Sequence, residues 1–336
     1  MTILLLSIST AMADDPATNP PPFAAPGKLI DVGGWRLHLH CTGEARASQP
    51  TVILESGTGD FSVEWSLVQP GVARFARVCS YDRAGMGWSD LGPHPRTMHQ
   101  IVWELHTLLD RGGVRPPYVL VGQSYGGLLV RLFASTYPAE VVGMVLIDSG
   151  SDDPIRVIGN NPPVRSSKLA TGKPIPAVQT SNPLHDSDIK GKLRDQIEAG
   201  ARSLAAHPND PPRDKLPPDA QRMRAWALGT VKHIVAGVNP WEVEAEELAG
   251  LRAERAKSEY PYGDMPLIVL TRGLTDDGRP DTTAGAEGHR KEQAPLAKLS
   301  RSGRQIIATH SGHHVHLDEP ELVIKSIREV VAATRR

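Results

Sequence analysis

The sequence predicts an α/β fold in which helices cover both faces of a mostly parallel sheet. Short apolar runs, such as those at 51–55 and 141–147, are typical of strands buried on both faces. Segments with helical periodicity separate these runs. Strands that alternate with helices indicate a parallel sheet, and such sheets place their chemistry at the carboxyl ends of the strands.

Length and charge limit the classes of protein that need to be considered. The chain has 336 residues and a formal net charge of −1, with acidic and basic residues interspersed. The length suits one large α/β domain with an insertion, or two domains. The charge balance gives no reason to expect nucleic acid or an anionic membrane surface as a partner.

Residues 1–13 form a short apolar run that ends in Ala11-Met12-Ala13, like the end of a secretory signal peptide. The run is too short to span a bilayer, and no Lys or Arg precedes it. We therefore expect export to the periplasm or the medium, with the cytoplasm as the alternative, and no stable membrane anchor. Residues 14–27, rich in Pro and Ala, are expected to form a linker.

Residues 28–148 are predicted to form the first part of the core. Two segments with period-two alternation flank Gly33-Gly34 and predict a hairpin. Helices are expected over 64–75 and from Thr97 to Gly112. Further strands are expected at 51–55, 77–81, 118–121 and 141–147.

Residues 149–264 interrupt this alternation of strands and helices and are expected to be a helical insertion, called here the cap segment. Proline pairs divide the segment, and no strand pattern is visible in it. Helices are expected near 189–206 and 219–235, and a third from Asn239, with a capping box that includes Glu242. Residues 265–336 then complete the core, with strands at 267–271 and 304–309 and helices over 283–299 and from Pro320.

The strand at 118–121 leads into Gly122-Gln123-Ser124-Tyr125-Gly126-Gly127, and a buried helix follows. Such a turn holds one serine in a strained conformation, and the flanking glycines remove Cβ atoms that would collide with the strand and the helix. Ser124 is therefore a candidate nucleophile. The N–H of Tyr125, at the start of the helix, points toward negative charge that develops beside the serine.

A serine nucleophile needs a histidine base, and the histidine needs a carboxylate. Asp276 and Asp277 follow the strand that ends at Thr271, and a third candidate, Asp148, ends the sixth strand. Four histidines follow the last strand, and the alternative is that they bind a metal ion. They share one loop without helical or strand spacing, so we expect neither metal nor cofactor. These histidines are His310, His313, His314 and His316.

Three motifs follow one another along the chain: a Gly-rich loop at 81–90, the serine turn at 122–127 and the histidine segment at 311–320. Together they make the chain resemble the α/β-hydrolases that carry a helical cap. The resemblance covers residues 28–336 apart from the insertion and implies an eight-stranded sheet. It implies Ser124 as the nucleophile and His313, which follows a glycine, as the base. It implies Asp276 or Asp277 as the acid, with Asp276 favoured, while some hydrolases of this fold use the position of Asp148. The motifs are the serine turn, Tyr81-Asp82-Arg83-Ala84-Gly85-Met86-Gly87-Trp88-Ser89-Asp90, and Ser311-Gly312-His313-His314-Val315-His316-Leu317-Asp318-Glu319-Pro320.

The resemblance also implies an oxyanion hole and a cysteine pair. The family often has His-Gly-x-Gly after its third strand, where this chain has Ser56-Gly57-Thr58-Gly59. Thr58 matches the backbone donor, and only its N–H is required beside that of Tyr125. The family's sheet order makes the second and fourth strands neighbours, so Cys41 and Cys79 are expected to be able to form a disulfide, provided that the protein is exported.

The sequence thus predicts a serine hydrolase that cleaves a small-molecule carboxylic ester through an acyl-serine intermediate. The aspartate nucleophile of related dehalogenases and epoxide hydrolases is absent. The alternatives are an aminopeptidase-like amidase and a hydrolase-like binding protein with vestigial turnover. An apolar face in the cap segment, formed by Trp226, Leu228, Val231 and Ile234, favours an ester with an apolar acyl chain.

Overall fold

The computed structural model describes residues 22–46, 49–156, 162–237, 241–275, 279 and 284–334. It contains an eight-stranded sheet of order β1-β2-β4-β3-β5-β6-β9-β10. The β1–β2 and β2–β4 pairs are antiparallel and the other pairs are parallel, as the alternation of elements predicts. The strands are β1 (Lys28–Asp31), β2 (Arg36–Thr42), β3 (Thr51–Glu55), β4 (Val78–Tyr81), β5 (Tyr118–Gln123), β6 (Val141–Ile147), β9 (Leu267–Arg272) and β10 (Gly303–Ala308).

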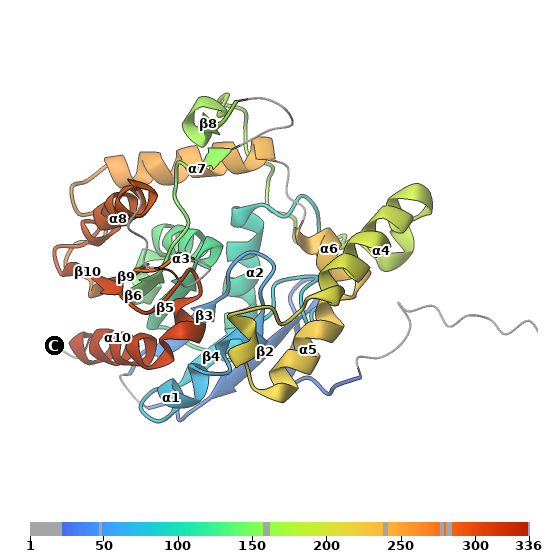
Figure 1. Cartoon of the computed structure of the whole chain (residues 1–336), viewed down its shortest axis with the longest axis horizontal. Coiled ribbons are helices and arrows are strands. Elements are labelled where there is room, and N and C mark those ends of the chain that lie inside the picture. Colours follow the sequence, from blue (N-terminus) through green and yellow to red (C-terminus); the bar gives the residue numbers. More distant parts are fainter. Residues whose placement is uncertain are drawn as a thin grey trace, which may run out of the picture.

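Helices cover both faces of this sheet (Figure 1). One face packs against α2 (Met98–Arg111), α3 (Tyr125–Thr136) and α8 (Ala284–Ala297), and the other packs against α1 (Gln69–Ala73) and α10 (Pro320–Ala333). Alternate residues of the central strands therefore enter two separate cores: Leu120 faces α3, whereas Val121 faces α10. This explains why these strands are continuously apolar.

Two predicted helices are broken in the structure. The segment 64–75 forms a 3₁₀ turn, η1 (Ser62–Trp65), and then α1, where Pro70 lies in the first turn. Proline has no N–H to donate, so it favours a new helix start over a continuing helix. The segment 219–235 forms α5 (Pro218–Leu228) and α6 (Val231–Gly237), because α5 ends at Gly229.

The cap segment between β6 and β9 also contains α4 (Gly191–Ala206) and α7 (Trp241–Ala256). Figure 1 shows α4, α5 and α6 grouped at one side of the sheet, while α7 lies over α3. The expectation that this segment contains no strand was wrong, since Ile155–Arg156 (β7) pairs with Val164–Arg165 (β8). The capping residue Asn239 lies outside the described residues. Shorter elements are η2 (Pro138–Glu140), η3 (Ser166–Lys168), η4 (Asp186–Asp188), η5 (Arg213–Lys215) and α9 (Val315–Asp318).

The apolar face expected in the cap segment serves mainly to pack the cap against the core. Trp226 of α5 lies against Trp88, with ring centroids 5.6 Å apart, and Leu228 is buried. Val231 packs against a small buried cluster that contains Leu91 and Val235.

No helix among the described residues is long and apolar enough to cross a membrane. The predicted signal peptide, residues 1–13, lies outside the described part of the chain, so the expectation of export stays a prediction.

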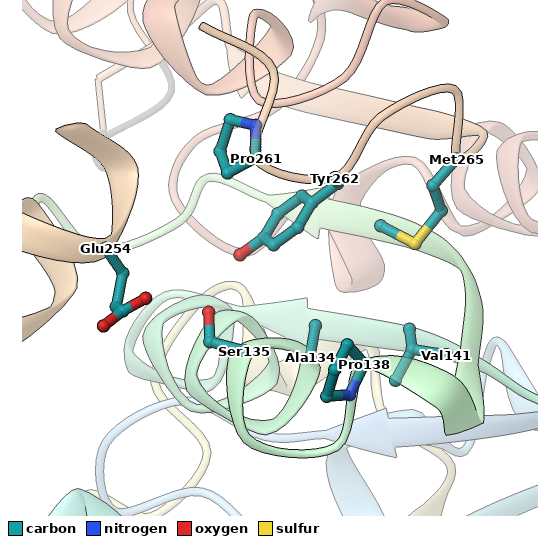
Figure 2. A pocket seen from close by; sticks show the side chains of 8 residues that line it. All are labelled: Ala134, Ser135, Pro138, Val141, Glu254, Pro261, Tyr262 and Met265. Carbon is teal, nitrogen blue, oxygen red and sulfur yellow. The ribbon is translucent and has the colours of Figure 1, made fainter. Parts of the chain in front are cut away.

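A pocket of about 290 Å³ lies between the end of α3, the start of β6 and the segment before β9 (Figure 2). Tyr262 and Glu254 project toward it from one side, and Ser135 from the other. Val141, the first residue of β6, also lines it. The pocket is therefore at the amino end of the parallel strands.

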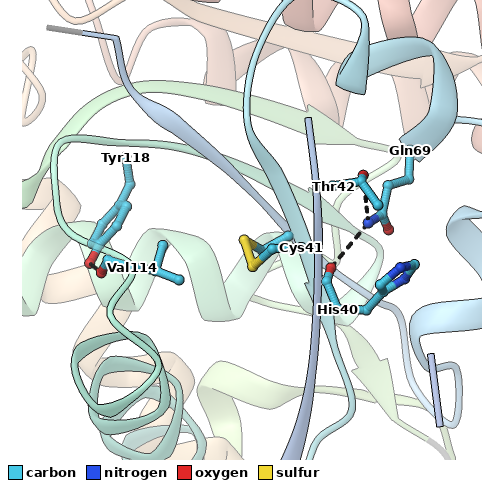
Figure 3. The surroundings of a disulfide bond; sticks show 7 residues. His40, Cys41, Thr42, Gln69, Val114 and Tyr118 are labelled. Carbon is cyan, nitrogen blue, oxygen red and sulfur yellow. Dashed lines mark hydrogen bonds between the residues drawn. A yellow bond between two sulfur atoms is a disulfide. The ribbon is translucent and has the colours of Figure 1, made fainter. Parts of the chain in front are cut away.

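Cys41 and Cys79 form a disulfide between β2 and β4 (Figure 3). The two residues are direct partners in the antiparallel register, as the predicted sheet order requires. Next to them, Gln69 donates hydrogen bonds to the carbonyl oxygen of His40 and to Thr42 Oγ1, which ties α1 to β2.

Candidate active site

Ser124 occupies a strained turn between β5 and α3, with φ 51° and ψ −120°. The glycines around it are required by close packing. A Cβ atom on Gly122 would lie 2.4 Å from the carbonyl oxygen of Gly126, and one on Gly126 would lie 2.4 Å from that of Glu55. The turn is fixed further because Ser124 N donates to the carbonyl oxygen of Ile147 over 3.0 Å. The predicted strand, turn and helix are therefore present.

His313 lies in the loop between β10 and α9, and its imidazole Nδ1 is 2.6 Å from Asp148 Oδ2. Its side chain is 27% exposed, whereas that of Asp148 is fully buried. Gln123, the neighbour of Ser124, donates from Nε2 to the carbonyl oxygen of His313 over 3.3 Å. The histidine loop is thus held directly beside the serine turn.

Asp148 follows the carboxyl end of β6 and is the carboxylate that the structure brings to His313. Its Oδ1 accepts hydrogen bonds from His289 Nε2, at 2.7 Å, and from Arg272 N, at 3.1 Å. Burial alone would raise the pKa of Asp148, but the hydrogen bonds from His289 and His313 outweigh it and hold this pKa well below its usual range. Asp148 is therefore ionised at neutral pH. Asp276 and Asp277, the other candidates for the acid, lie outside the described residues.

The loop that carries Thr58 packs on the serine turn. A Cβ atom on Gly57 would lie 3.3 Å from Ser124 Cβ and 2.2 Å from Gln123 Oε1, so a larger residue there would displace the Gln123 side chain. Thr58 itself is exposed and Ser124 is half-buried. Tyr125 is the first residue of α3, where a backbone N–H has no acceptor within the helix. The two predicted oxyanion donors are therefore on the Thr58 loop and at the first residue of α3, next to Ser124.

Arg83 fixes the loop that carries Thr58 through an ion pair and hydrogen bonds to its backbone. Its guanidinium donates to Glu55 Oε1 over 2.6 Å, to the carbonyl oxygen of Ser56 over 2.7 Å, and to that of Gly57. In a trans peptide the C=O and the following N–H point in opposite directions. Because the Gly57 carbonyl points at Arg83, the N–H of Thr58 points away from it.

The other three histidines of the last loop have separate surroundings. The side chain of His310 is 84% exposed and lies near Glu319, while His316 is buried against Trp65. His314 Nε2 lies 2.9 Å from Arg213 Nη2. Burial and then the charge of Arg213 lower the pKa of His314 to about 3, so its neutral ring accepts this hydrogen bond. No group of three or more His, Cys, Asp or Glu side chains in the described parts of the chain is arranged to hold a metal ion.

Two arginines of the cap segment reach two buried carboxylates of the core. Arg213 Nη2 lies 3.0 Å from Asp60 Oδ1, and Arg224 Nη1 lies 3.1 Å from the same oxygen. Arg224 Nη1 also contacts Glu64 Oε1. Because Arg213 binds His314 as well, this contact joins the cap segment to the end of the Thr58 loop and to the His313 loop.

The pocket beside Tyr262 is not part of this site. It opens at the start of β6, whereas Asp148 follows the end of that strand and Ser124 follows the end of β5. The site residues lie at the carboxyl ends of the strands, where ligands of open α/β sheets bind.

Comparison with known proteins supports this architecture. A family model described as alpha/beta hydrolase fold matches residues 50–182. The chain is 26% identical over 317 residues to an AB hydrolase superfamily protein of Gibberella zeae, which covers 89% of this chain and 92% of the relative. Together with the sheet order and the serine turn above, these matches show that the chain has the α/β-hydrolase fold.

Solved structures support the same fold. A thermophilic esterase from Thermogutta terrifontis is 17% identical, with a TM-score of 0.58, and covers 92% of this chain and 100% of its own. The enol-lactonase from Burkholderia xenovorans is 18% identical, with a TM-score of 0.59, and covers 91% of this chain and 100% of its own. At this level of identity the likeness concerns the fold.

Proposed function

We propose that this α/β-hydrolase cleaves a carboxylic ester through an acyl-serine intermediate, with Ser124 as the nucleophile, His313 as the base and Asp148 as the acid. The observation that carries the proposal is the 2.6 Å hydrogen bond between His313 Nδ1 and Asp148 Oδ2 beside the strained Ser124 turn. Serine, acid and histidine follow in the chain order that this fold uses.

The protonation state of Asp148 assigns the roles within the triad. An ionised carboxylate only accepts hydrogen bonds, so the Nδ1 of His313 carries the proton of the neutral ring and its Nε2 is the unprotonated nitrogen that takes the proton of Ser124. Ser124 Oγ then bonds to the acyl carbon, and the carbonyl oxygen becomes an oxyanion. The ester C–O bond then breaks as His313 gives the proton to the departing alcohol, which leaves an acyl-serine. Water, deprotonated by the same nitrogen, attacks the acyl carbon; the bond to Oγ breaks, the carboxylic acid product leaves and Ser124 regains its proton.

The oxyanion would be stabilised by the backbone N–H groups of Thr58 and Tyr125. The Arg83 contacts support this role for Thr58, since they fix the Gly57 carbonyl on the opposite side of the peptide. The N–H of Tyr125 is supplied by the start of α3.

An ester is favoured over a peptide with a free amino terminus. An aminopeptidase needs carboxylates that are free to bind the substrate's ammonium group. Asp60 and Glu64, which lie beside the His314 loop, are already neutralised by Arg213 and Arg224. The pairing of these carboxylates supports ester hydrolysis over the amidase alternative.

The test compares p-nitrophenyl esters of graded acyl length with amino-acyl anilides on purified protein. We expect ester turnover that exceeds anilide turnover and falls by on the order of 10⁴-fold or more in Ser124→Ala. Anilide turnover equal to ester turnover would favour the amidase. Full ester turnover in folded Ser124→Ala would exclude the acyl-serine mechanism.

A further inference from the structure

We infer that His289 is a positioning residue that orients Asp148 for His313, so that the carboxylate of the acid is held by one histidine at each oxygen. The inference rests on the proposed function. His289 Nε2 binds Asp148 Oδ1 at 2.7 Å, while His313 Nδ1 binds Oδ2 at 2.6 Å. Each imidazole uses its own carboxylate oxygen. His289 therefore binds the carboxylate oxygen that His313 leaves unused, and its effect on His313 is transmitted through Asp148.

The carboxylate of Asp148 needs such a second contact to keep one orientation. Within the described residues, Oδ1 also accepts the backbone N–H of Arg272 over 3.1 Å, and the guanidinium of the same arginine lies 3.6 Å from Oδ2. Without His289, the Oδ1 side of the carboxylate would depend on this backbone donor, while His313 and the Arg272 guanidinium both lie at Oδ2. Because Asp148 is buried, a hydrogen bond from His289 to its charged form is stronger than one at the surface. The hydrogen bond from His289 therefore fixes the orientation of the Asp148 carboxylate, to which His313 Nδ1 donates.

The helix that carries His289 is held at this spot by a second contact. Gln293 lies one turn further along α8, and its Nε2 donates to the carbonyl oxygen of Ser149 over 2.7 Å. His289 and Gln293 thus bind two consecutive residues, Asp148 and Ser149. Gln293 anchors the helix without touching the acid, which makes it the matched control for a merely structural role of His289.

The experiment measures kcat and KM for a p-nitrophenyl ester in four variants with a confirmed fold. We expect His289→Ala to lower kcat about 10- to 100-fold and to change KM less than about twofold, since a hydrogen bond to a charged group is lost at a site that does not bind substrate. His289→Gln, whose amide can donate from the position of Nε2, should restore kcat to within about threefold. Gln293→Ala should keep kcat within about threefold. His289→Asn, polar but too short to reach Asp148, replaces the alanine variant if that variant unfolds.

Wild-type kcat in folded His289→Ala or His289→Asn would overturn the inference, and so would a loss of kcat in His289→Gln as large as in His289→Ala. Asp148→Asn and Asp276→Asn separate this failure from a failure of the proposed function. We expect on the order of a 10⁴-fold loss of kcat in Asp148→Asn and little change in Asp276→Asn. If Asp148→Asn loses activity while His289→Ala does not, only the inference fails. If Asp148→Asn keeps its rate, the acid is misassigned and the inference fails with it.

Discussion

His233 is a buried titratable residue that links the cap segment to the Thr58 loop. It lies on α6, is 3% exposed, and packs edge-on against Phe61 with ring centroids 6.4 Å apart. Burial, and then the positive charge of Arg224, lower the pKa of His233 to about 4. A histidine in the unfolded chain has a pKa near ~6.5. At pH values between these two, the unfolded chain therefore binds a proton that folded His233 does not.

The free energy of unfolding should consequently fall as the pH is lowered from about 7.5 to 5. When only the unfolded state binds the proton, stability decreases with decreasing pH, by about 2 kcal/mol over this range for a group that titrates like His233. Urea unfolding of wild type and His233→Gln at both pH values measures the effect. The variant should lose less stability on acidification, whereas His310→Gln, a change at an exposed side chain, should behave like wild type. The same pH dependence in all three proteins would show that His233 does not cause the loss of stability on acidification.

At the scale of elements, α5 is held to the core by charge as well as by apolar packing. Arg224 is buried and binds Asp60, Glu64 and the carbonyl oxygen of Pro208. Arg222, two residues earlier on the same helix, pairs with Asp219 at the surface, where its side chain is 60% exposed. The two arginines thus form a natural comparison between a buried and an exposed ion pair.

Arg224→Ala should lower the free energy of unfolding by about 3 kcal/mol, because it leaves the buried Glu64 carboxylate without this partner. Arg222→Ala should change it by less than about 1 kcal/mol, since solvent screens the exposed pair. Urea denaturation midpoints at one pH compare the two variants. Equal losses of stability would mean that the contact between α5 and the core depends on packing alone.

The elements that the sequence predicted best are those with a purely local signal. Continuous apolar runs predicted β3 and β6 with the observed bounds, and Thr97 was correctly identified at the start of α2, where its side chain accepts a hydrogen bond from Gln100 N. The helices over 64–75 and 219–235 were predicted as continuous, because the apolar spacing persists across the breaks at Pro70 and Gly229. The strand pair β7–β8 was missed because two residues a strand carry no periodicity.

At the scale of the whole molecule, the sheet brings together residues that the sequence alone leaves unconnected. Ser124 and His313 could be proposed from the sequence because Gly122 and Gly126 lie two residues either side of the serine and Gly312 directly precedes the histidine. Asp148 was the third candidate for the acid, since its contact with His313 spans 165 positions and depends on the order of β6, β9 and β10. Asp276, the candidate that the sequence favoured, lies outside the described residues, so that choice stays a prediction. His289 gave no signal, because a histidine within a helix resembles any other polar residue until the helix is docked on the sheet.

The most direct test of the account is the mass of the protein after reaction with a fluorophosphonate, followed by mapping of the modified peptide. We predict one adduct for each chain, on the peptide that contains Ser124, because the proposed triad activates this serine through His313 and Asp148. Ser124→Ala should take up no reagent, and Asp148→Asn should react far more slowly than wild type. An adduct on another serine, or equal labelling of folded Ser124→Ala, would contradict the assignment of Ser124 as the nucleophile.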